Sequence, residues 1–573
     1  MTEESVPSGA TRPAFLEDTP GPVLPRLFTG VSLLAILALG FHVRFTGLSE
    51  VGFFSSDNAM YARHGRFYYR IAFPVGDSGT PDPQPAQSDL RKEQRRLRNI
   101  VDRWNASAKD SYNKPAFGHA WLTALAMAFL GPVDYASHVV SALLGWATIL
   151  LVFFLGLRPL GTPGALLSAA ALAVSPYAVF YARTGFPDAD SVFFLILGMI
   201  VYSVRSRAAL RKRLFVAGLM FGLGGVIHYR WLAIYPLFLV TQFWAWPGTR
   251  RERGKACVWG LVGYGVPFLL AEIPSYAMLL VAGAAERPLP GIHTYWTNLL
   301  HLLFQAGGHR GLNPAAIVIY PLYVLANDGA LVFLSALFGL LWTFRKRWKQ
   351  NHAWICFLGA LMIYLFLIEI HIARLFSAGI PIVCLLAGAG LSVCVRFGVQ
   401  RWRIPSVLAC GLALLLVLGT GSLLLSPHLS ASSGARSVAH YLKDQGVRSV
   451  VVPDPEFGEE AYRFYDPELK IRGADSRTEI KDGPDDEPAW IVLDQTPYLM
   501  QVSTFERWEE IRRRLQAEAG PPFTTVSNFD GWWRHVNFET HLLDRHTTWD
   551  RWRRHGDCEP RPIEIYRVPP ARP

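Results

Sequence analysis

The chain has 573 residues, of which 51% are hydrophobic and only 18% are charged. A soluble protein of this length normally carries about 25% charged residues, so the composition excludes an ordinary soluble enzyme. The formal net charge of +11 at first suggests a nucleic-acid partner. Lys and Arg cluster instead in short segments between long apolar runs, as the positive-inside rule requires of a membrane protein, and we expect no nucleic-acid partner.

Residues 1–26 are polar and rich in proline, and we interpret them as a disordered cytoplasmic tail. The pattern does not fit a cleavable signal, because no positive region leads directly into the first apolar run and no small-residue cleavage site follows it. A membrane span takes about 20 apolar residues, or fewer inside a bundle. Eleven spans are predicted, at 27–46, 134–156, 164–182, 191–205, 214–229, 231–246, 257–282, 328–344, 353–370, 375–395 and 405–426.

The connections between these spans differ in charge, and this predicts their sides of the membrane. The basic connections are expected to be cytoplasmic, and the link at 157–163 falls on the same side by counting. They are 205–213, 249–255, 345–349 and 396–403. The extracytoplasmic side then holds 47–133, 183–190, 228–231, 283–327, 369–374 and everything after about residue 428.

Two extracytoplasmic regions have structure of their own. In the first outer loop, 47–133, residues 57–72 and 113–130 have the pattern of amphipathic helices at the membrane surface, and 91–104 is a basic helix candidate. The tail, 428–573, alternates helical patterns with strands such as 488–494 and 563–568. We therefore predict a polytopic α-helical membrane domain, 27–427, followed by a soluble extracytoplasmic α/β domain.

Polar side chains gather in the segments predicted to be extracytoplasmic. They are Asp57, Tyr61, Arg63, Lys114, Arg183, Asp188, Asp190, His228, Arg230, His309, Glu369, His371 and Arg374. Charges at membrane depth are costly and usually pair or line a polar cavity. Each also has a structural interpretation: an Arg can anchor a span end, His371 can pack at a rim, and Asp188 can cap a helix that begins at Ser191. Convergence of five connections on one face favours a site.

The chemistry suited to such a set is transfer of a group from a lipid phosphate. An exposed carboxylate can act as general base toward a hydroxyl or an amine. Lys and Arg can neutralise the phosphate while the bond to the leaving group breaks. A cavity that opens toward the membrane would let a lipid donor enter sideways.

Four segments resemble the family 39-type glycosyltransferases of the GT-C superfamily, which include protein O-mannosyltransferases and the lipid A aminoarabinose transferase. DNAMYAR (57–63) resembles their DExxYA signature, and NKPAFGHAWLTALAMAFLG (113–131) resembles their (E/D)KPPLxYW…FG segment. YARTGFPDADSVFF (181–194) is similar to their third-span exit, and HIARLFSAGIPIVCLLAGAGL (371–391) to a late R-Y-x-x-P segment. The resemblance covers about residues 27–426 and implies a GT-C fold of about eleven transmembrane helices.

The resemblance also implies an activity and roles for residues. The family inverts the anomeric centre of a polyprenyl-phosphate sugar on the non-cytoplasmic side. Carried over, Asp57 is the catalytic base, and Lys114 and Arg374 bind the donor phosphate. Asp188 is a second acidic site residue, and His228 or Arg230 stands where relatives often have a basic residue, with Arg230 as a third phosphate ligand.

The chain also departs from the family pattern. Asn58 replaces the usual second acid, Asn113 replaces the acid before Lys-Pro, and Ala116 and Phe117 replace Pro-Leu. Asn113 weakens a metal site of the aminoarabinose transferase kind. We therefore expect no required metal or other cofactor, with a divalent cation as the alternative.

The expected partners are a polyprenyl-phosphate sugar, the lipid bilayer, and a protein, lipid or polysaccharide acceptor. The expected location is the inner (plasma) membrane, as a multi-pass protein with its C-terminal domain extracytoplasmic. One alternative is an oligosaccharyltransferase-like enzyme, although FDGWWRH (529–535) lacks the order of a WWDxG motif. Another is a lipid or glycan transporter, for which the sequence shows no internal repeat.

Overall fold

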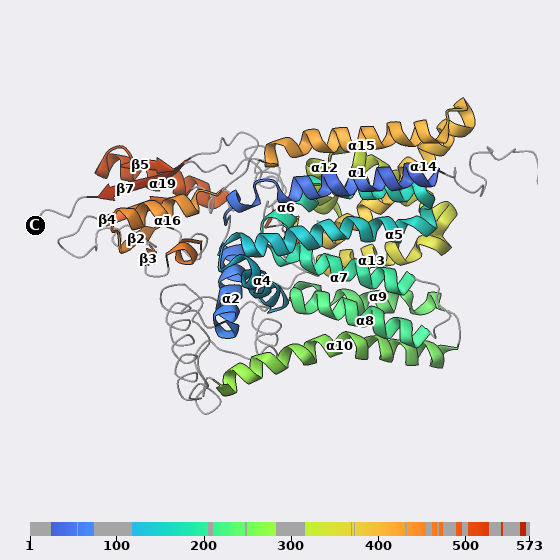
Figure 1. The fold of residues 1–573 in the computed structure, drawn as a ribbon, viewed down its shortest axis with the longest axis horizontal. Coiled ribbons are helices and arrows are strands. Elements are labelled where there is room, and N and C mark those ends of the chain that lie inside the picture. The colour runs from blue at the N-terminus through green and yellow to red at the C-terminus, as the bar shows by residue number, and fades with distance from the viewer. Residues whose placement is uncertain are drawn as a thin grey trace, which may run out of the picture.

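The computed structural model describes two parts of the chain, a bundle of long helices and a small sheet domain beyond one end of it (Figure 1). The described residues are 24–53, 56–73, 117–203, 210–246, 249–281, 316–367, 370–371, 373–429, 433–453, 461–466, 469–473, 489–494, 502–526, 540–541 and 562–568. Residues 1–23 of the predicted tail and the predicted basic helix at 91–104 lie outside them. We call the end of the bundle that faces the sheet the domain-facing end, and the opposite one the far end.

The bundle contains helices that coincide with the predicted spans. They are α1 (Arg26–Phe45), α5 (Tyr135–Ala173), α6 (Pro176–Arg183), α7 (Pro187–Ser203), α8 (Leu210–Ile227), α9 (Ile234–Gln242), α10 (Arg250–Val281), α12 (Ala316–Trp342), α13 (Trp348–Phe366), α14 (Ile380–Trp402) and α15 (Ser406–Leu429). Among the described residues, six helices are long and apolar enough to cross a membrane, or seven if the bent pair α6–α7 counts as one span. The polytopic helical prediction is confirmed, but its number of eleven is higher than this count, because several predicted spans correspond to short helices such as α9.

Helix α5 is a hairpin, not one straight rod. Gly161 in its middle has φ 73° and ψ 176°, which is not helical. A Cβ on Gly40 of α1 would meet both Ile149 and Ala173, at 2.4 and 3.5 Å. In a straight helix those two residues would stand roughly 36 Å apart, at 1.5 Å per residue. The chain therefore turns back at Gly161, in agreement with the two separate spans predicted at 134–156 and 164–182.

The start of α6 is fixed by polar groups from two helices. Ser175 is the N-cap, and its hydroxyl accepts a hydrogen bond from the backbone N–H of Ala178 at 3.1 Å. Asp328 of α12 accepts from the Ser175 hydroxyl at 2.7 Å and from the N–H of Tyr177 at 3.3 Å. A helix begins with N–H groups that have no partner inside the helix, so these bonds hold α6 at a defined place in the bundle.

The C-terminal domain is a mixed sheet of five strands in the order β3-β2-β4-β7-β5. The strands are β2 (Ser449–Val452), β3 (Lys470–Gly473), β4 (Ala489–Leu493), β5 (Thr524–Val526) and β7 (Ile563–Val568), and the helices are α16 (Ala435–Asp444) and α19 (Val502–Ala519). β2 runs parallel to β3 and β4, whereas β7 is antiparallel to β4 and β5. The predicted strands at 488–494 and 563–568 are confirmed.

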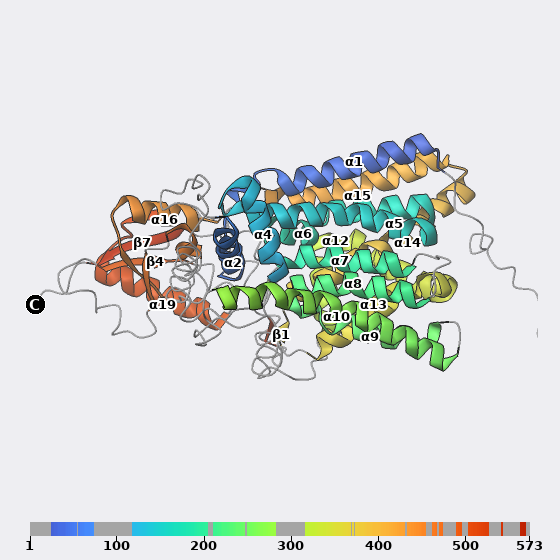
Figure 2. The same ribbon diagram turned by 60° about the horizontal axis from the view of Figure 1, so that its bottom comes forward.

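Two further helices, α2 (Ser56–Ala72) and α4 (Phe117–Leu130), lie between the bundle and the sheet domain in both views (Figures 1 and 2). Met60 and Tyr61 of α2 belong to the apolar core of the bundle. Ala59 and Ala62 belong instead to a second core that includes Val438 and Leu442 of α16. Helix α2 is therefore packed between the two parts of the protein, and α2 and α4 confirm that the two predicted segments of the first outer loop are helical.

An ion pair joins the sheet domain to the bundle. Nε of Arg436 in α16 donates to Oδ2 of Asp134 at 3.1 Å, and Tyr465 donates its hydroxyl to the same oxygen at 2.6 Å. Arg436 also donates to the backbone oxygen of Ser49 at 2.9 Å. Burial would raise the pKa of the Asp134 carboxyl, but the hydrogen bonds from Arg436 and Tyr465 outweigh burial, so that its pKa lies below the ordinary value.

A second contact joins α2 directly to the sheet domain. The guanidinium of Arg66 donates to the backbone oxygens of Phe464 at 2.7 Å and Pro132 at 2.8 Å. The central carbon of this guanidinium, Cζ, lies 3.7 Å from the centroid of the Phe464 ring, which is a cation–π contact. Arg66 thus ties α2 to the sheet domain and to the loop before α5 at the same time.

Candidate functional site

The candidate site is built around the corner between α6 and α7. The two helices meet at 116°. Gly185 at the corner has φ +68°, a left-handed conformation that side chains disfavour. The backbone oxygen of Thr184 accepts a hydrogen bond from the Asn58 side chain of α2 at 3.1 Å, and that of Phe186 accepts from Ser141 of α5 at 3.0 Å. The corner is therefore attached to α2 on one side and to α5 on the other.

Two buried carboxylates occupy the first turn of α7, just after this corner. Asp188 and Asp190 are both 0% exposed. Oδ2 of Asp190 lies 2.7 Å from Nδ1 of His119 in α4, and Oδ1 of Asp188 lies 3.8 Å from Nε2 of His228. The positive end of the helix dipole favours negative charge at this position. The helix begins at Pro187 and not at Ser191, so Asp188 lies inside its first turn, and the capping interpretation of Asp188 is wrong.

Helices α2 and α4 close the site from the side of the sheet domain. The rings of Tyr61 and His119 pack edge to face, with centroids 5.8 Å apart. One turn further along both helices, a Cβ on Gly65 would lie 2.5 Å from Cγ2 of Thr123, so the two backbones approach closely there. Through His119 and Asp190, this pair of helices is attached to α7.

Helix α2 has two buried basic residues next to one another. Arg63 and His64 are both buried, at 9% and 8% exposed. Burial, followed by the nearby charge of Arg63, lowers the pKa of His64 to about 3, so this imidazole is neutral at pH 7. A buried guanidinium close to the site is suited to an anionic ligand such as a phosphate.

Arg374 reaches the corner from the opposite part of the bundle. It belongs to the short helix η7 (Ala373–Gly379), and its guanidinium carbon lies 5.4 Å from the centroid of the Phe186 ring. The preceding strand, β1 (Ile370–His371), pairs antiparallel with β6 (Thr540–His541) of the C-terminal region. The C-terminal region thus contacts the chain next to Arg374 as well as α2.

Other predicted site residues have different positions. Arg183 points away from the carboxylates: its guanidinium donates to the backbone oxygens of Val43 at 2.9 Å and Thr46 at 2.7 Å, at the end of α1. It therefore joins α6 to α1 as a buried residue, 1% exposed, which differs from a side chain that anchors a span end by reaching the membrane surface. For Asp57, Arg230 and His371 only the backbone is described, and Lys114, His309 and Glu369 lie outside the described residues.

The structure adds His119 and Asn58 to the candidate site. The sequence indicated the segment 113–131 through Lys114, and Asn58 only as a departure from the family pattern. The contact of His119 with Asp190 joins residues 71 positions apart, so no local pattern predicts it. The available signal was that His119 is a polar residue within a mostly apolar predicted helix.

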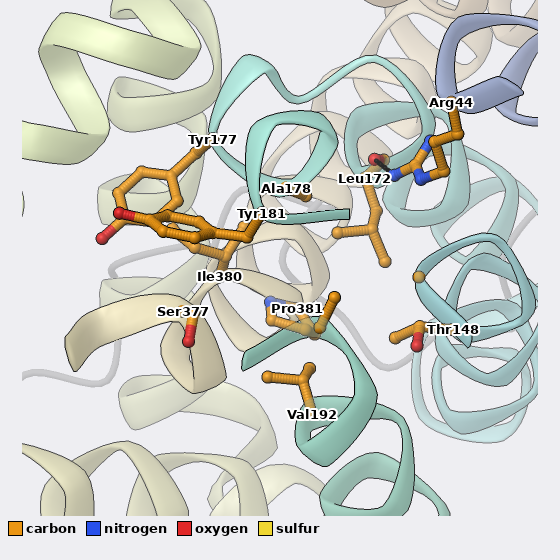
Figure 3. A pocket seen from close by; sticks show the side chains of 12 residues that line it. Arg44, Thr148, Leu172, Tyr177, Ala178, Tyr181, Val192, Ser377, Ile380 and Pro381 are labelled. Atoms are coloured by element: carbon orange, nitrogen blue, oxygen red, sulfur yellow. Dashed lines mark hydrogen bonds between the residues drawn. The ribbon is translucent and has the colours of Figure 1, made fainter. Parts of the chain in front are cut away.

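A small cavity lies next to the corner, between α5, α6, α7 and α14 (Figure 3). Its volume is about 30 Å³, which holds about one water molecule. Arg44 lines one side and donates to the backbone oxygens of Ala173 at 2.9 Å and Leu172 at 3.0 Å. Ser377 lines the other side (Figure 3). The cavity is too small for a sugar or a lipid, so we place the candidate site at the carboxylates of α7 and not in the cavity.

Comparison with known proteins gives a family match for part of the chain. Residues 113–272 match the sequence profile of the dolichyl-phosphate-mannose-protein mannosyltransferase family. The predicted family resemblance is confirmed. The match contains His119, both carboxylates of α7 and His228, but neither Asp57 nor Arg374. A search of curated protein sequences finds no match to the chain.

Solved structures share the fold of the chain. ArnT from Cupriavidus metallidurans in the apo state superposes with a TM-score of 0.52 at 15% identity, over 83% of this chain and 94% of ArnT. The same enzyme bound to undecaprenyl phosphate gives 0.51 at 15% identity, over 84% and 95%. The apo oligosaccharyltransferase of Archaeoglobus fulgidus gives 0.50 at 11% identity, over 86% and 70%. At these identities the likeness establishes the fold alone.

The corner itself gives a test of the site's construction. A Cβ on Gly185 would lie 2.5 Å from Cδ2 of His138 and 2.7 Å from Oγ of Ser137. We expect Gly185→Ala to lower the free energy of unfolding by about 2–4 kcal/mol, from the left-handed φ and the overpacking together. Thermal unfolding in detergent measures this. Gly254→Ala is the control, because nothing lies within 4 Å of a Cβ there; equal melting temperatures for the two variants would contradict the expectation.

Proposed function

We propose that this protein is an inverting glycosyltransferase that moves a sugar from a polyprenyl-phosphate donor to an acceptor on the extracytoplasmic side of the membrane. The observation that carries the proposal is the corner between α6 and α7, where two buried carboxylates, the start of α2 and the Arg374 guanidinium come together. The family match over residues 113–272 and the fold shared with ArnT, solved with undecaprenyl phosphate, support the same class of donor.

In this proposal Asp57 is the general base. By helical spacing, position 57 shares a face of α2 with position 61, and Tyr61 packs on His119 at the carboxylates. An acceptor hydroxyl attacks the anomeric carbon from the side opposite the phosphate, and Asp57 accepts its proton. The bond between the anomeric carbon and the phosphate oxygen breaks, and polyprenyl phosphate leaves with the electron pair. Arg374, with Lys114 and Arg230, stabilises the charge on the departing phosphate.

The ends of the helices support an assignment of the two sides of the membrane. α1 ends at the domain-facing end, where Val51 accepts a hydrogen bond from Ser433 N–H at 2.8 Å, so α1 begins at the far end. α15 likewise begins at the far end and leads toward the sheet domain (Figure 1). Arg26 at the start of α1, Arg401 in the last turn of α14 and Arg403 just after it therefore lie at the far end. The positive-inside rule supports a cytoplasmic far end and an extracytoplasmic sheet domain.

We propose further that transfer needs no metal ion. Among the described side chains, no group of three or more His, Cys, Asp or Glu residues is placed to hold one. The His119–Asp190 and His228–Asp188 pairs each offer one imidazole and one carboxylate, and a tight protein site takes three or four ligands. We expect turnover to be unchanged after EDTA treatment and gel filtration into metal-free buffer. A loss that Mg²⁺, Mn²⁺ or Zn²⁺ restores would contradict this.

The experiment that tests the function uses purified full-length protein in detergent with a panel of polyprenyl-phosphate sugars, beginning with the mannose form. A transferase releases free polyprenyl phosphate and glycosylates an acceptor or water, whereas a transporter moves the lipid in vesicles without cleaving it. An oligosaccharyltransferase would require a glycan longer than one sugar on the donor. Movement of uncleaved donor in proteoliposomes, with no release from any member of the panel, would overturn the proposal.

A further inference from the structure

His119 is the point at which three helices of the candidate site meet. It lies in the first turn of α4, it is 0% exposed, and its ring packs against Tyr61 of α2. Its Nδ1 lies 2.7 Å from Oδ2 of Asp190 in α7. A carboxylate only accepts hydrogen bonds, so Nδ1 carries the proton and donates it in this bond. In this tautomer the lone pair of the imidazole is on Nε2.

Within the described part of the chain, buried polar atoms of His119, Asp190 and Thr123 have no hydrogen-bond partner. Among the described residues, no group bonds to Nε2 of His119, to Oδ1 of Asp190 or to Oγ1 of Thr123, although all three are buried. Thr123 follows His119 by four residues and so shares its face of α4. A buried polar group without a hydrogen bond costs about 1–3 kcal/mol, so such an atom on each of three residues of the site is unusual in a folded protein.

We propose that His119 is a substrate-binding residue whose Nε2 accepts a hydrogen bond from a hydroxyl group, with Asp190 as the residue that positions the imidazole. This rests on the proposed function, because the hydroxyl belongs either to the donor sugar or to the acceptor. Both molecules carry hydroxyl groups. A hydroxyl group can donate a hydrogen bond, and Nε2 can accept it. The carboxylate fixes the tautomer, as second partners of functional histidines commonly do.

The arrangement distinguishes His119 from the neighbouring histidine of the site. Nε2 of His228 lies 3.8 Å from Asp188, beyond hydrogen-bond distance, so that carboxylate does not fix its tautomer. His119 has a hydrogen bond that orients its ring, and no described residue bonds to its other ring nitrogen. Thr123 is one turn after His119 on the same face of α4, and its hydroxyl can donate a hydrogen bond to a ligand or accept one from it.

The test compares three variants of the full-length protein with the polyprenyl-phosphate sugar that the wild type turns over. In His119→Asn, the amide N–H takes the place of Nδ1 and retains the bond to Asp190, but the Nε2 acceptor is lost. In His119→Gln, the amide reaches the position of Nε2. Asp190→Asn leaves the ring but removes the carboxylate that fixes its tautomer. Melting temperatures in detergent confirm that each variant is folded.

We expect His119→Asn to lower kcat/KM about tenfold or more, which is the effect of one lost hydrogen bond to a substrate hydroxyl. His119→Gln should recover part of this loss, and Asp190→Asn should show a smaller loss. If the hydroxyl belongs to the donor sugar, both hydrolysis of the donor by water and transfer to an acceptor fall. If it belongs to the acceptor, only transfer falls.

Wild-type activity in His119→Asn would overturn the inference, because it would show that His119 only attaches α4 to α7. Equal losses in His119→Asn and His119→Gln, with melting temperatures lowered in both, would overturn it in the same way. Failure of the proposed function has a different result, because the wild type itself would then cleave no donor.

Discussion

Asp57→Asn is expected to lower the rate of sugar transfer by about 10²- to 10⁴-fold, the usual contribution of a positioned general base. The amide keeps the size of the side chain but cannot accept a proton. Asp57 is the second residue of α2, and Asn58 beside it is bound to the α6–α7 corner, so position 57 is held at the site. Release of polyprenyl phosphate by the purified variant measures the effect.

The controls separate chemistry from folding. Asp444→Asn changes an exposed carboxylate on α16 and should leave the rate unchanged. Asp57→Glu retains a carboxylate at a shifted position and should keep more activity than the amide. If Asp57→Asn turned over donor at the wild-type rate, Asp57 would not be the base, and Asp188 or Asp190 would become the candidates.

Arg436→Ala is expected to weaken the attachment of the sheet domain by about 2–4 kcal/mol, because Asp134 would remain buried without its ionic partner. Asp134 is 5% exposed and would retain only the Tyr465 hydroxyl as a donor from the sheet domain. Because Arg66 and the second core attach the same domain to α2, we expect donor turnover to fall as well. Limited proteolysis and thermal unfolding in detergent measure the first effect.

The attachment of the sheet domain should also depend on pH in the wild type, which gives a second measurement. The pKa of Asp134 lies below its ordinary value of 3.8, so its stabilising contribution is present above that value and is lost as the pH falls through the lowered pKa. The wild-type attachment should therefore not change between about pH 5 and pH 8, and should weaken only in strongly acidic solution. Arg513→Ala on the exposed face of α19 is the matched control. Proteolysis of Arg436→Ala at the rate of that control would contradict the role of the ion pair.

The sequence predicted the fold where the signal is local. Long apolar runs located the bundle helices, and the strand patterns at 488–494 and 563–568 match β4 and β7. The two helices of the first outer loop were predicted as well. Composition alone predicted more spans than the long helices of the described residues provide, because short helices such as α9 are apolar as well.

The site was predicted only in part, because it depends on contacts between distant segments. The sequence indicated that Asp188, Asp190 and Arg374 gather on one face, and the structure brings them to the same corner. The sequence did not show that Arg183 differs from the other site candidates. Its partners are backbone oxygens at the end of α1, and no sequence pattern marks them. The sequence also gave no role to His119, whose partner lies on another helix, or to the contacts of the sheet domain with α2.

The most direct test of the proposal is the amount of free polyprenyl phosphate that the purified protein releases from a polyprenyl-phosphate sugar, measured by mass spectrometry together with the glycosylated product. We predict one polyprenyl phosphate for each sugar transferred or hydrolysed by the wild type, and almost none by Asp57→Asn in the same assay. Equal release by both proteins would contradict the role of Asp57, and no release by the wild type from any donor of the panel would contradict the proposed transferase activity itself.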